Sequence, residues 1–151
     1  MMVRGKWVLA ALLGSMVGMA ASQAFAQADV IEKRQQLMKG QSAAAKAIKG
    51  AVESKDYATV ETKAKEIMGN ADQVVSLFPK GSTKGKTKAT DAIWDKSDDF
   101  AKAAKNLSKA AGELAAAAKS GDAGAVDAKV KAVSGACGNC HKAFRAEKYS
   151  E

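Results

Sequence analysis

Apolar side chains recur every seven residues along most of this chain, and this spacing limits the possible folds more than any other feature. The first such stretch has two neighbouring series of apolar residues seven positions apart. One series is Val30, Leu37, Ala44 and Ala51, and the other is Ile31, Met38, Ala45 and Val52. Residues with this period fall on one side of a helix. The spacing therefore predicts a long amphipathic helix from about Asp29 to Ser54.

Three further stretches show the same kind of pattern. The second runs from about residue 56 to 77, the third from about 90 to 119, and the fourth from about 122 to 147. The only long connection, residues 78–88, contains Pro79 and two glycines. Four amphipathic helices joined mostly by short turns predict an all-α fold, an antiparallel four-helix bundle. An extended coiled coil shares this spacing, but the breaks at residues 55–56 and 121–122 favour the closed bundle.

The composition agrees with helices and raises a question about the core. Aromatic residues make up only 5% of the chain and there is a single proline, which excludes an all-β sandwich or barrel. Much of the apolar content is alanine, a strong helix former with a small side chain. A bundle of this composition is short of large side chains, so something else must help to fill its interior.

The first 26 residues have the three parts of a secretory signal. Arg4 and Lys6 form a positive start, residues 7–21 are apolar and uncharged, and residues 24–26 read Ala-Phe-Ala. We therefore expect a cleaved signal peptide over residues 1–26, a mature domain over residues 27–151, and a periplasmic location. The alternative is an uncleaved membrane anchor, although the apolar run is short for a span of roughly 20 residues.

Charge indicates the kind of partner. The formal net charge is +8, and loss of the two basic residues before position 27 lowers it to +6. Acidic proteins would suit such a basic surface. Nucleic acid is a poor candidate partner, since we expect the protein to be exported and find no basic run with interleaved aromatic residues. The sequence shows no nucleophile–base constellation that a substrate reaction would need, so we expect no catalytic residue and no enzyme.

The fourth helical stretch contains one motif with specific chemistry, Cys137-Gly138-Asn139-Cys140-His141. Two thiols three residues apart lie on one helical face, so each can add across one vinyl group of a porphyrin. The histidine that follows is placed to bind the iron. This C-x-x-C-H sequence predicts one covalently attached haem c, held through Cys137 and Cys140, with His141 as an iron ligand.

Other uses of this motif fit less well. A structural zinc site needs four ligands, and the chain has only two cysteines and one histidine. A thioredoxin-type pair follows a strand and begins a helix, whereas this pair lies within a helical stretch. A structural disulfide suits an oxidising compartment but does not account for the adjacent histidine.

The residue on the other side of the iron would decide the function. Beyond residue 26 the chain has no second histidine and only two methionines, Met38 and Met68. Met38 lies within the apolar stripe of the first helix, where its sulfur could bind iron. Alternatively, Met38 only packs there and leaves the iron open to small gases, since methionine on an apolar helix face is commonly part of the core.

Several stretches of the chain resemble the class II cytochromes c, the cytochrome c' family. The first helix contains Arg34-Gln35-x-x-Met38, similar to the family's Arg-Gln followed three positions later by a distal haem residue. The central region has Leu77-Phe78-Pro79 and then Ile93-Trp94, and the end has C-x-x-C-H followed by Phe144-Arg145. The likeness covers essentially the whole of residues 27–151.

The resemblance implies two kinds of function. Low-spin members use a methionine at the position of Met38 as an iron ligand and carry single electrons between other periplasmic redox proteins. This is the function we expect, with His141 and Met38 as the two metal ligands. In the alternative, a high-spin member leaves the iron five-coordinate and binds nitric oxide or carbon monoxide.

The resemblance also implies roles for three polar residues and for an assembly. Arg34 and Gln35 would lie near the haem edge, where a cation could offset a propionate, and Arg145 would lie on the proximal side near the His141 imidazole. Ordinary solvent-exposed helix surface is the alternative for all three. Homodimers through the first two helices are common in the family.

Overall fold

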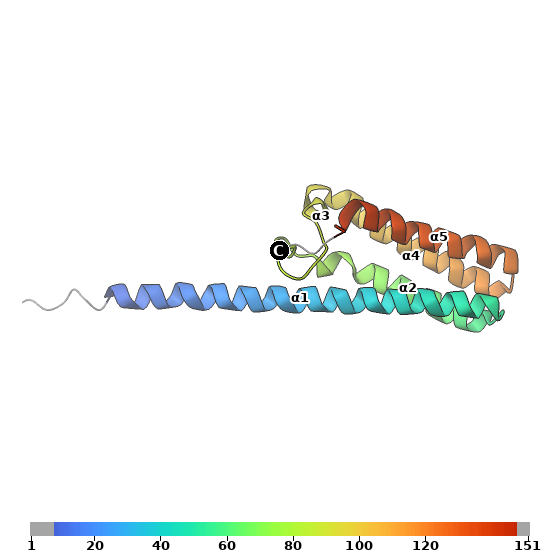
Figure 1. The fold of residues 1–151 in the computed structure, drawn as a ribbon, viewed down its shortest axis with the longest axis horizontal. Coiled ribbons are helices and arrows are strands. Elements are labelled where there is room, and N and C mark those ends of the chain that lie inside the picture. Colours follow the sequence, from blue (N-terminus) through green and yellow to red (C-terminus); the bar gives the residue numbers. More distant parts are fainter. Residues whose placement is uncertain (1–7, 148–151) are drawn as a thin grey trace, which may run out of the picture.

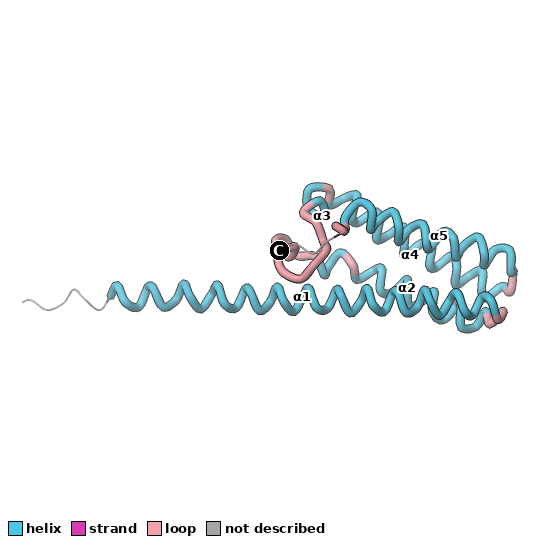
Figure 2. The backbone as a smooth tube through the Cα atoms, viewed as in Figure 1, coloured by secondary structure: helices cyan, strands magenta, loops and turns pink. Residues whose placement is uncertain are grey.

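The computed structural model describes residues 8–147, with side chains from Gln27 onwards, and this part of the chain is almost entirely helical (Figure 2). Its elements are α1 (Val8–Glu53), α2 (Tyr57–Gln73), the short 3-10 helix η1 (Val75–Leu77), α3 (Ala92–Asp95), α4 (Ser97–Ser120) and α5 (Ala123–Phe144). The described residues form no strand, and their only β-type pairing is an isolated antiparallel bridge between Ala89 and Arg145.

The long helices pack in chain order, α1 against α2, α2 against α4, and α4 against α5 (Figure 1). Short turns join α1 to α2 and α4 to α5, so each of these pairs is antiparallel. The all-α four-helix bundle predicted from the spacing is confirmed. Among the described residues, α1 and α5 are not a closely packed pair, so the fourth side of the bundle is the loosest.

Local signals in the sequence account for the two tight turns. The Asp56 carboxylate accepts a hydrogen bond from the Thr59 backbone N–H at 3.0 Å, as an N-cap does. Gly121 ends α4 with φ +74°, in the left-handed region, and the Asp122 carboxylate then accepts from the Ala125 N–H at 3.0 Å to begin α5. Both turns lie where the sequence predicts them.

Helix boundaries differ from the expectation in several places. The third helix is broken: α3 ends at Asp95, Lys96 has φ −128°, and α4 begins at Ser97. The first helix begins at Val8 and not near Asp29, and the last ends at Phe144 because Arg145 is extended. The final turn of the second helical stretch is the 3-10 helix η1, in which the chain winds more tightly before the loop.

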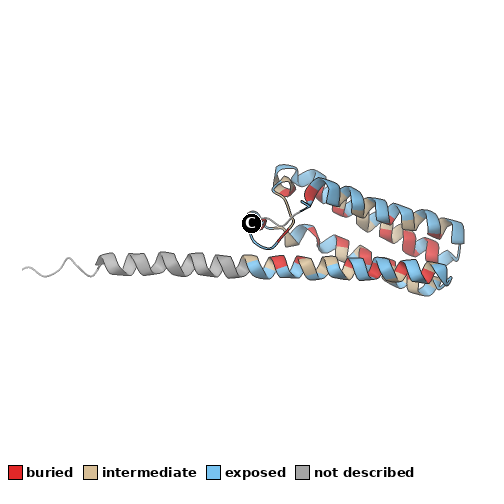
Figure 3. Cartoon of the chain, viewed as in Figure 1, coloured by how far each residue is buried: buried red, intermediate tan, exposed pale blue. Residues whose placement is uncertain are grey.

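The core divides into two clusters along the bundle. Figure 3 shows the buried residues on the inward sides of the helices. The aromatic cluster lies near the loop and is built on Val74, Ile93, Phe100, Ala104 and Phe144. The alanine cluster fills the rest of the bundle and is built on Ala44, Ile48, Ala51, Val60, Ala64, Ile67, Ala111, Leu114, Ala115, Ala117, Ala118, Val126 and Val133.

The aromatic cluster contains every phenylalanine beyond position 26. The Phe78 and Phe100 rings meet edge to face with centroids 5.0 Å apart, and the Phe100 and Phe144 rings meet in the same way at 5.1 Å. Edge-to-face contacts hold the rings in a preferred orientation and stabilise the fold in addition to the burial of their apolar surface. The few bulky side chains are thus concentrated at the end of the bundle where the loop and the end of α5 meet.

The predicted signal peptide lies partly outside the described residues, because residues 1–7 are not described and only the backbone is given for residues 8–26. Within the described part of the chain, no helix has the length and apolar character needed to cross a membrane. The domain boundary between residues 26 and 27 therefore remains a prediction.

Two glycines provide a matched test of the fold. A Cβ added at Gly69 or at Gly121 would meet nothing within 4 Å, but Gly121 alone has positive φ. Gly121→Ala should lower the free energy of unfolding by about 1 kcal/mol. Gly69→Ala should raise it by about 0.5–1 kcal/mol, because α2 continues through that position. Urea unfolding followed by circular dichroism measures both, and equal effects would contradict the assigned caps.

Candidate functional site

The two cysteines of the C-x-x-C-H sequence lie on the inward face of α5. Both side chains are half-buried and both thiols are free. Cys137 packs against the alanine cluster and Cys140 against the aromatic cluster, so the pair lies where the two clusters meet. Burial raises the pKa of both thiols, and the neighbouring Cys137 also raises that of Cys140. At neutral pH they are therefore protonated.

His141 lies on the same helix, and its side chain is exposed. Partial burial lowers the pKa of its imidazole, and the positive charge of Arg145 one turn later lowers it further. The imidazole is therefore neutral at neutral pH and keeps a nitrogen lone pair for a metal. At 3.6 residues per turn, His141 points to the side of α5 opposite Asn139, which lies in the groove between α4 and α5. His141 thus faces away from α4.

Helix α1 contributes Met38 to the same region. Its half-buried side chain packs against the aromatic cluster, as Cys140 does from α5. Met38 and the cysteine motif, distant in the sequence, therefore meet at one part of the core. Met68, the other methionine beyond residue 26, packs instead against the alanine cluster.

Gln41, one turn after Met38, is buried without a hydrogen-bond partner. Its side chain is 9% exposed, and both Nε2 and Oε1 are enclosed with no partner among the described residues. A buried amide left in this state costs about 1–3 kcal/mol. Such a group inside an otherwise apolar core needs an explanation beyond packing.

Arg34 is buried as well, with 3% exposure, and it ties α1 to the long loop. Its Nη1 donates to Ser82 Oγ at 2.8 Å, and its Nη2 donates to Thr87 Oγ1 at 2.9 Å and to the Ser82 carbonyl. The guanidinium also lies 4.7 Å from the centroid of the Phe78 ring. Burial lowers its pKa, although arginine remains charged. None of the ion pairs among the described residues includes Arg34.

Gln35 and Arg145 occupy more open positions. The half-buried Gln35 donates from Nε2 to the Lys86 carbonyl at 2.5 Å and so supports the same loop. Arg145 is exposed at the end of α5, where it forms the bridge to Ala89. After burial, its charge is the second cause that lowers the pKa of the His141 imidazole. The structure therefore brings Arg34, Gln35 and Met38 together on α1, and Arg145 and His141 on α5.

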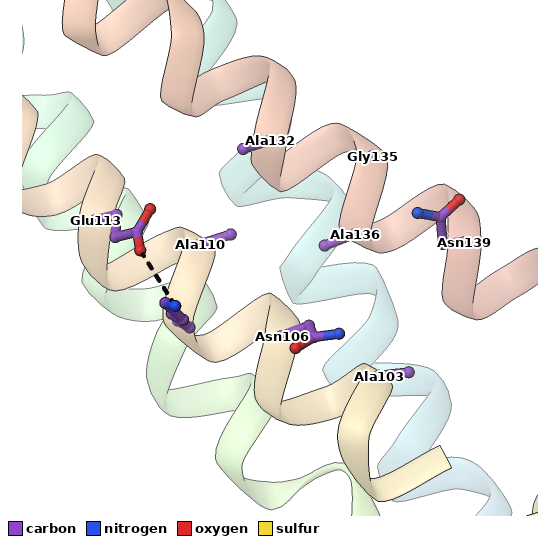
Figure 4. Close-up of a pocket in the computed structure, with 9 residues that line it drawn as sticks. Ala103, Asn106, Ala110, Glu113, Ala132, Gly135, Ala136 and Asn139 are labelled. Carbon is purple, nitrogen blue, oxygen red and sulfur yellow. Dashed lines mark ion pairs between the residues drawn. The ribbon is translucent and has the colours of Figure 1, made fainter. Parts of the chain in front are cut away.

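A separate groove of about 420 Å³ runs between α4 and α5 (Figure 4). Small residues and two asparagines line it, and Lys109 and Glu113 form an ion pair of 4.0 Å there. Asn139 is the only residue of the C-x-x-C-H sequence that lines it. The thiols lie on another face of α5, so the groove is not where the motif would hold a cofactor.

The residues described above have features that a large, flat, apolar cofactor would need in its binding site. The two half-buried thiols share one face of α5, the unpartnered amide of Gln41 lies on α1, and these two helices are not closely packed. The residues present therefore fit such a group. Within the described chain, no group of three or more histidine, cysteine or acidic side chains could hold a metal ion.

Comparison with known proteins agrees with this geometry. A family model described as Cytochrome C' matches residues 29–145. The chain belongs to the cytochrome c' family. It is 34% identical over 146 residues to the cytochrome c' of Rhodospirillum rubrum, covering 94% of this chain and 99% of that protein.

Solved structures of the family share the fold. The crystal structure of cytochrome c' from Thermochromatium tepidum matches with a TM-score of 0.74 at 30% identity, over 80% of this chain and 97% of that one. A cytochrome c' with ligand-controlled dimer dissociation matches with the same TM-score at 28% identity and the same coverage. Cytochromes c' carry one covalently attached c-type haem, and this protein is accordingly a monohaem c-type cytochrome.

Three residues of this region, Gln41, Ser82 and Thr87, were not predicted from the sequence. Gln41 lies seven residues after Arg34 and seven before the buried Ile48, so the heptad spacing could have placed it on the inward face. The predicted stripe instead included Ala45, which is exposed. Ser82 and Thr87, the loop partners of Arg34, had no signal in the sequence, because no local pattern specifies which helix a loop will contact.

The contacts of Arg34 predict its contribution to stability. Arg34→Met removes three hydrogen bonds from a charged donor to the loop and should lower the free energy of unfolding by about 2 kcal/mol. Lys33→Met, on the exposed side of the same turn, is the matched control and should change it by less than about 0.5 kcal/mol. Urea unfolding of the haem-loaded protein measures the difference, and equal effects would sink this assignment.

Proposed function

We propose that this cytochrome binds a small diatomic gas, nitric oxide or carbon monoxide, on the α1 side of the iron opposite His141. The observation that carries the proposal is the near full-length similarity to proteins named cytochrome c'. This favours the alternative reading over the electron carrier that the sequence led us to expect. The half-buried Met38 would then pack beside the gas site as part of the aromatic cluster.

The haem, when bound, would supply an iron that takes up a gas or exchanges one electron. Cys137 and Cys140 would hold it through two thioether bonds, one from each thiol to a vinyl group of the haem. His141 would provide a neutral nitrogen to the metal. The two thioether bonds retain the cofactor even where the surrounding side chains are small.

Arg34, Gln35 and Arg145 would provide the polar surroundings in this proposal. Arg34 is a buried cation held by neutral hydroxyl and carbonyl oxygens, with no carboxylate partner among the described ion pairs. Its charge would therefore offset an anionic propionate nearby. Gln35 would hold the loop in place beside it, and Arg145 would add to burial in lowering the pKa of the His141 imidazole.

The second candidate is a low-spin electron carrier in which Met38 is the second metal ligand. The observation that favours it is that Met38 and Cys140 pack against the same cluster from opposite helices. In that case the partners would be other periplasmic redox proteins, and acidic ones would suit the net charge of the chain.

One set of spectra distinguishes the two functions. A gas-binding protein should show a high-spin ferric spectrum and should bind carbon monoxide rapidly when reduced, and Met38→Ala should leave the spin state unchanged. Met68→Ala is the matched control, since Met68 packs against the alanine cluster. A low-spin spectrum with a weak far-red band that Met38→Ala abolishes, together with slow carbon monoxide binding, would instead establish the electron carrier.

Export, haem attachment and assembly can be measured together. We propose a periplasmic protein that begins at Gln27 and forms a homodimer through α1 and α2, since one similar cytochrome c' is described by its ligand-controlled dimer dissociation. Native mass spectrometry of periplasmic protein should give two such chains with one haem each. Cys137→Ala combined with Cys140→Ala should release the haem under denaturing conditions. A chain that retains residues 1–26 would contradict the predicted cleavage before Gln27. A monomer at micromolar concentration would contradict the predicted homodimer.

A further inference from the structure

The buried amide of Gln41 is the polar group that packing does not explain. Nine-tenths of its side chain is buried, and its Nε2 and Oε1 atoms have no partner in the described structure. A leucine or methionine would fill the same space without the cost of an unpaired amide. The amide of Asn70 on α2 lies close to the neighbouring Gly40, yet it does not pair with Gln41.

The position of Gln41 along the bundle matches that of the cysteine motif. On α1, Gln41 lies between Met38, which packs against the aromatic cluster, and Ala44, which belongs to the alanine cluster. On α5, Cys140 packs against the first of these clusters and Cys137 against the second. Gln41 and the two thiols therefore lie at the same level of the core, on two helices that do not pack closely.

The other polar side chains of α1 near Gln41 either donate hydrogen bonds to the loop or are exposed. Arg34, two turns earlier, donates to the loop, and Gln35 donates to the Lys86 carbonyl. Ser42 and Lys39 are exposed. Among these described residues, Gln41 is thus the buried polar side chain of α1 whose hydrogen-bond donor has no partner.

We propose that Gln41 is a specificity-determining residue whose amide N–H donates a hydrogen bond to the diatomic gas bound on the Met38 side. The inference deepens the proposed function and rests on it. A bound diatomic carries partial negative charge on its outer atom, which can accept a hydrogen bond. An amide enclosed in an apolar core is strong in this role, because no water competes for the donor.

The test is the infrared C–O stretch of the reduced carbon monoxide complex, measured on the haem-loaded protein. Gln41→Met keeps nearly the same volume and removes the donor. It should raise the C–O stretching frequency and speed carbon monoxide dissociation roughly fivefold, the value of one ordinary hydrogen bond. Gln36→Met is the matched control, because Gln36 is exposed on the same helix and bonds only Glu32.

Both substitutions are also made in a Met38→Ala background, where the α1 side of the iron is open in either proposed function. A shift with Gln41→Met in that background supports the inference, even if the unsubstituted protein fails to bind carbon monoxide and so refutes the gas-binding function. An unchanged C–O frequency in that background, or equal shifts with Gln36→Met, overturns the inference and leaves Gln41 as an amide paired with buried water.

Discussion

The close packing of α2 on α4 is the interaction on which the rest of this structure depends. The facing side chains are mostly alanine, and Ala64 and Ala111 are fully buried. A Cβ added at Gly112 on α4 would lie 3.2 Å from the sulfur of Met68 on α2, which shows how near the two helices come. Small side chains allow this approach and place α1 and α5 on the two flanks, without close packing between them.

The long loop stabilises the open end that this packing leaves. Arg34 donates to Ser82 and Thr87 from α1, while the Thr90 and Ala146 backbone N–H groups donate to the Phe144 and Lys88 carbonyls. The loop therefore joins the two helices that do not pack on each other. The phenylalanines beneath it supply the large apolar surface that the alanine cluster lacks. Cys140 and Met38 lie against this surface, and Cys137 lies against the adjoining alanine cluster.

The sequence patterns predicted which segments form helices better than they predicted the residues at which each helix begins and ends. Asp56, Gly121 and Asp122 act as the caps that their positions indicate, because a cap depends only on a few neighbouring backbone groups. The break at Lys96 was missed, since the apolar spacing continues from Ile93 to Phe100 without interruption. The C-x-x-C-H sequence predicts covalent haem attachment for the same local reason, because its two thiols and its imidazole lie within two turns of one helix.

What the sequence by itself determined, then, is the four helical stretches, the two tight turns and the presence of one covalently attached haem. Each of these depends on contacts between residues a few positions apart. Only the tertiary structure decided that Arg34 is buried against the loop and that Gln41 lies unpaired at the level of Cys137 and Cys140. The physical reason is that burial of a polar group depends on which distant helix or loop packs over it, and heptad spacing specifies the inward face but not its neighbour.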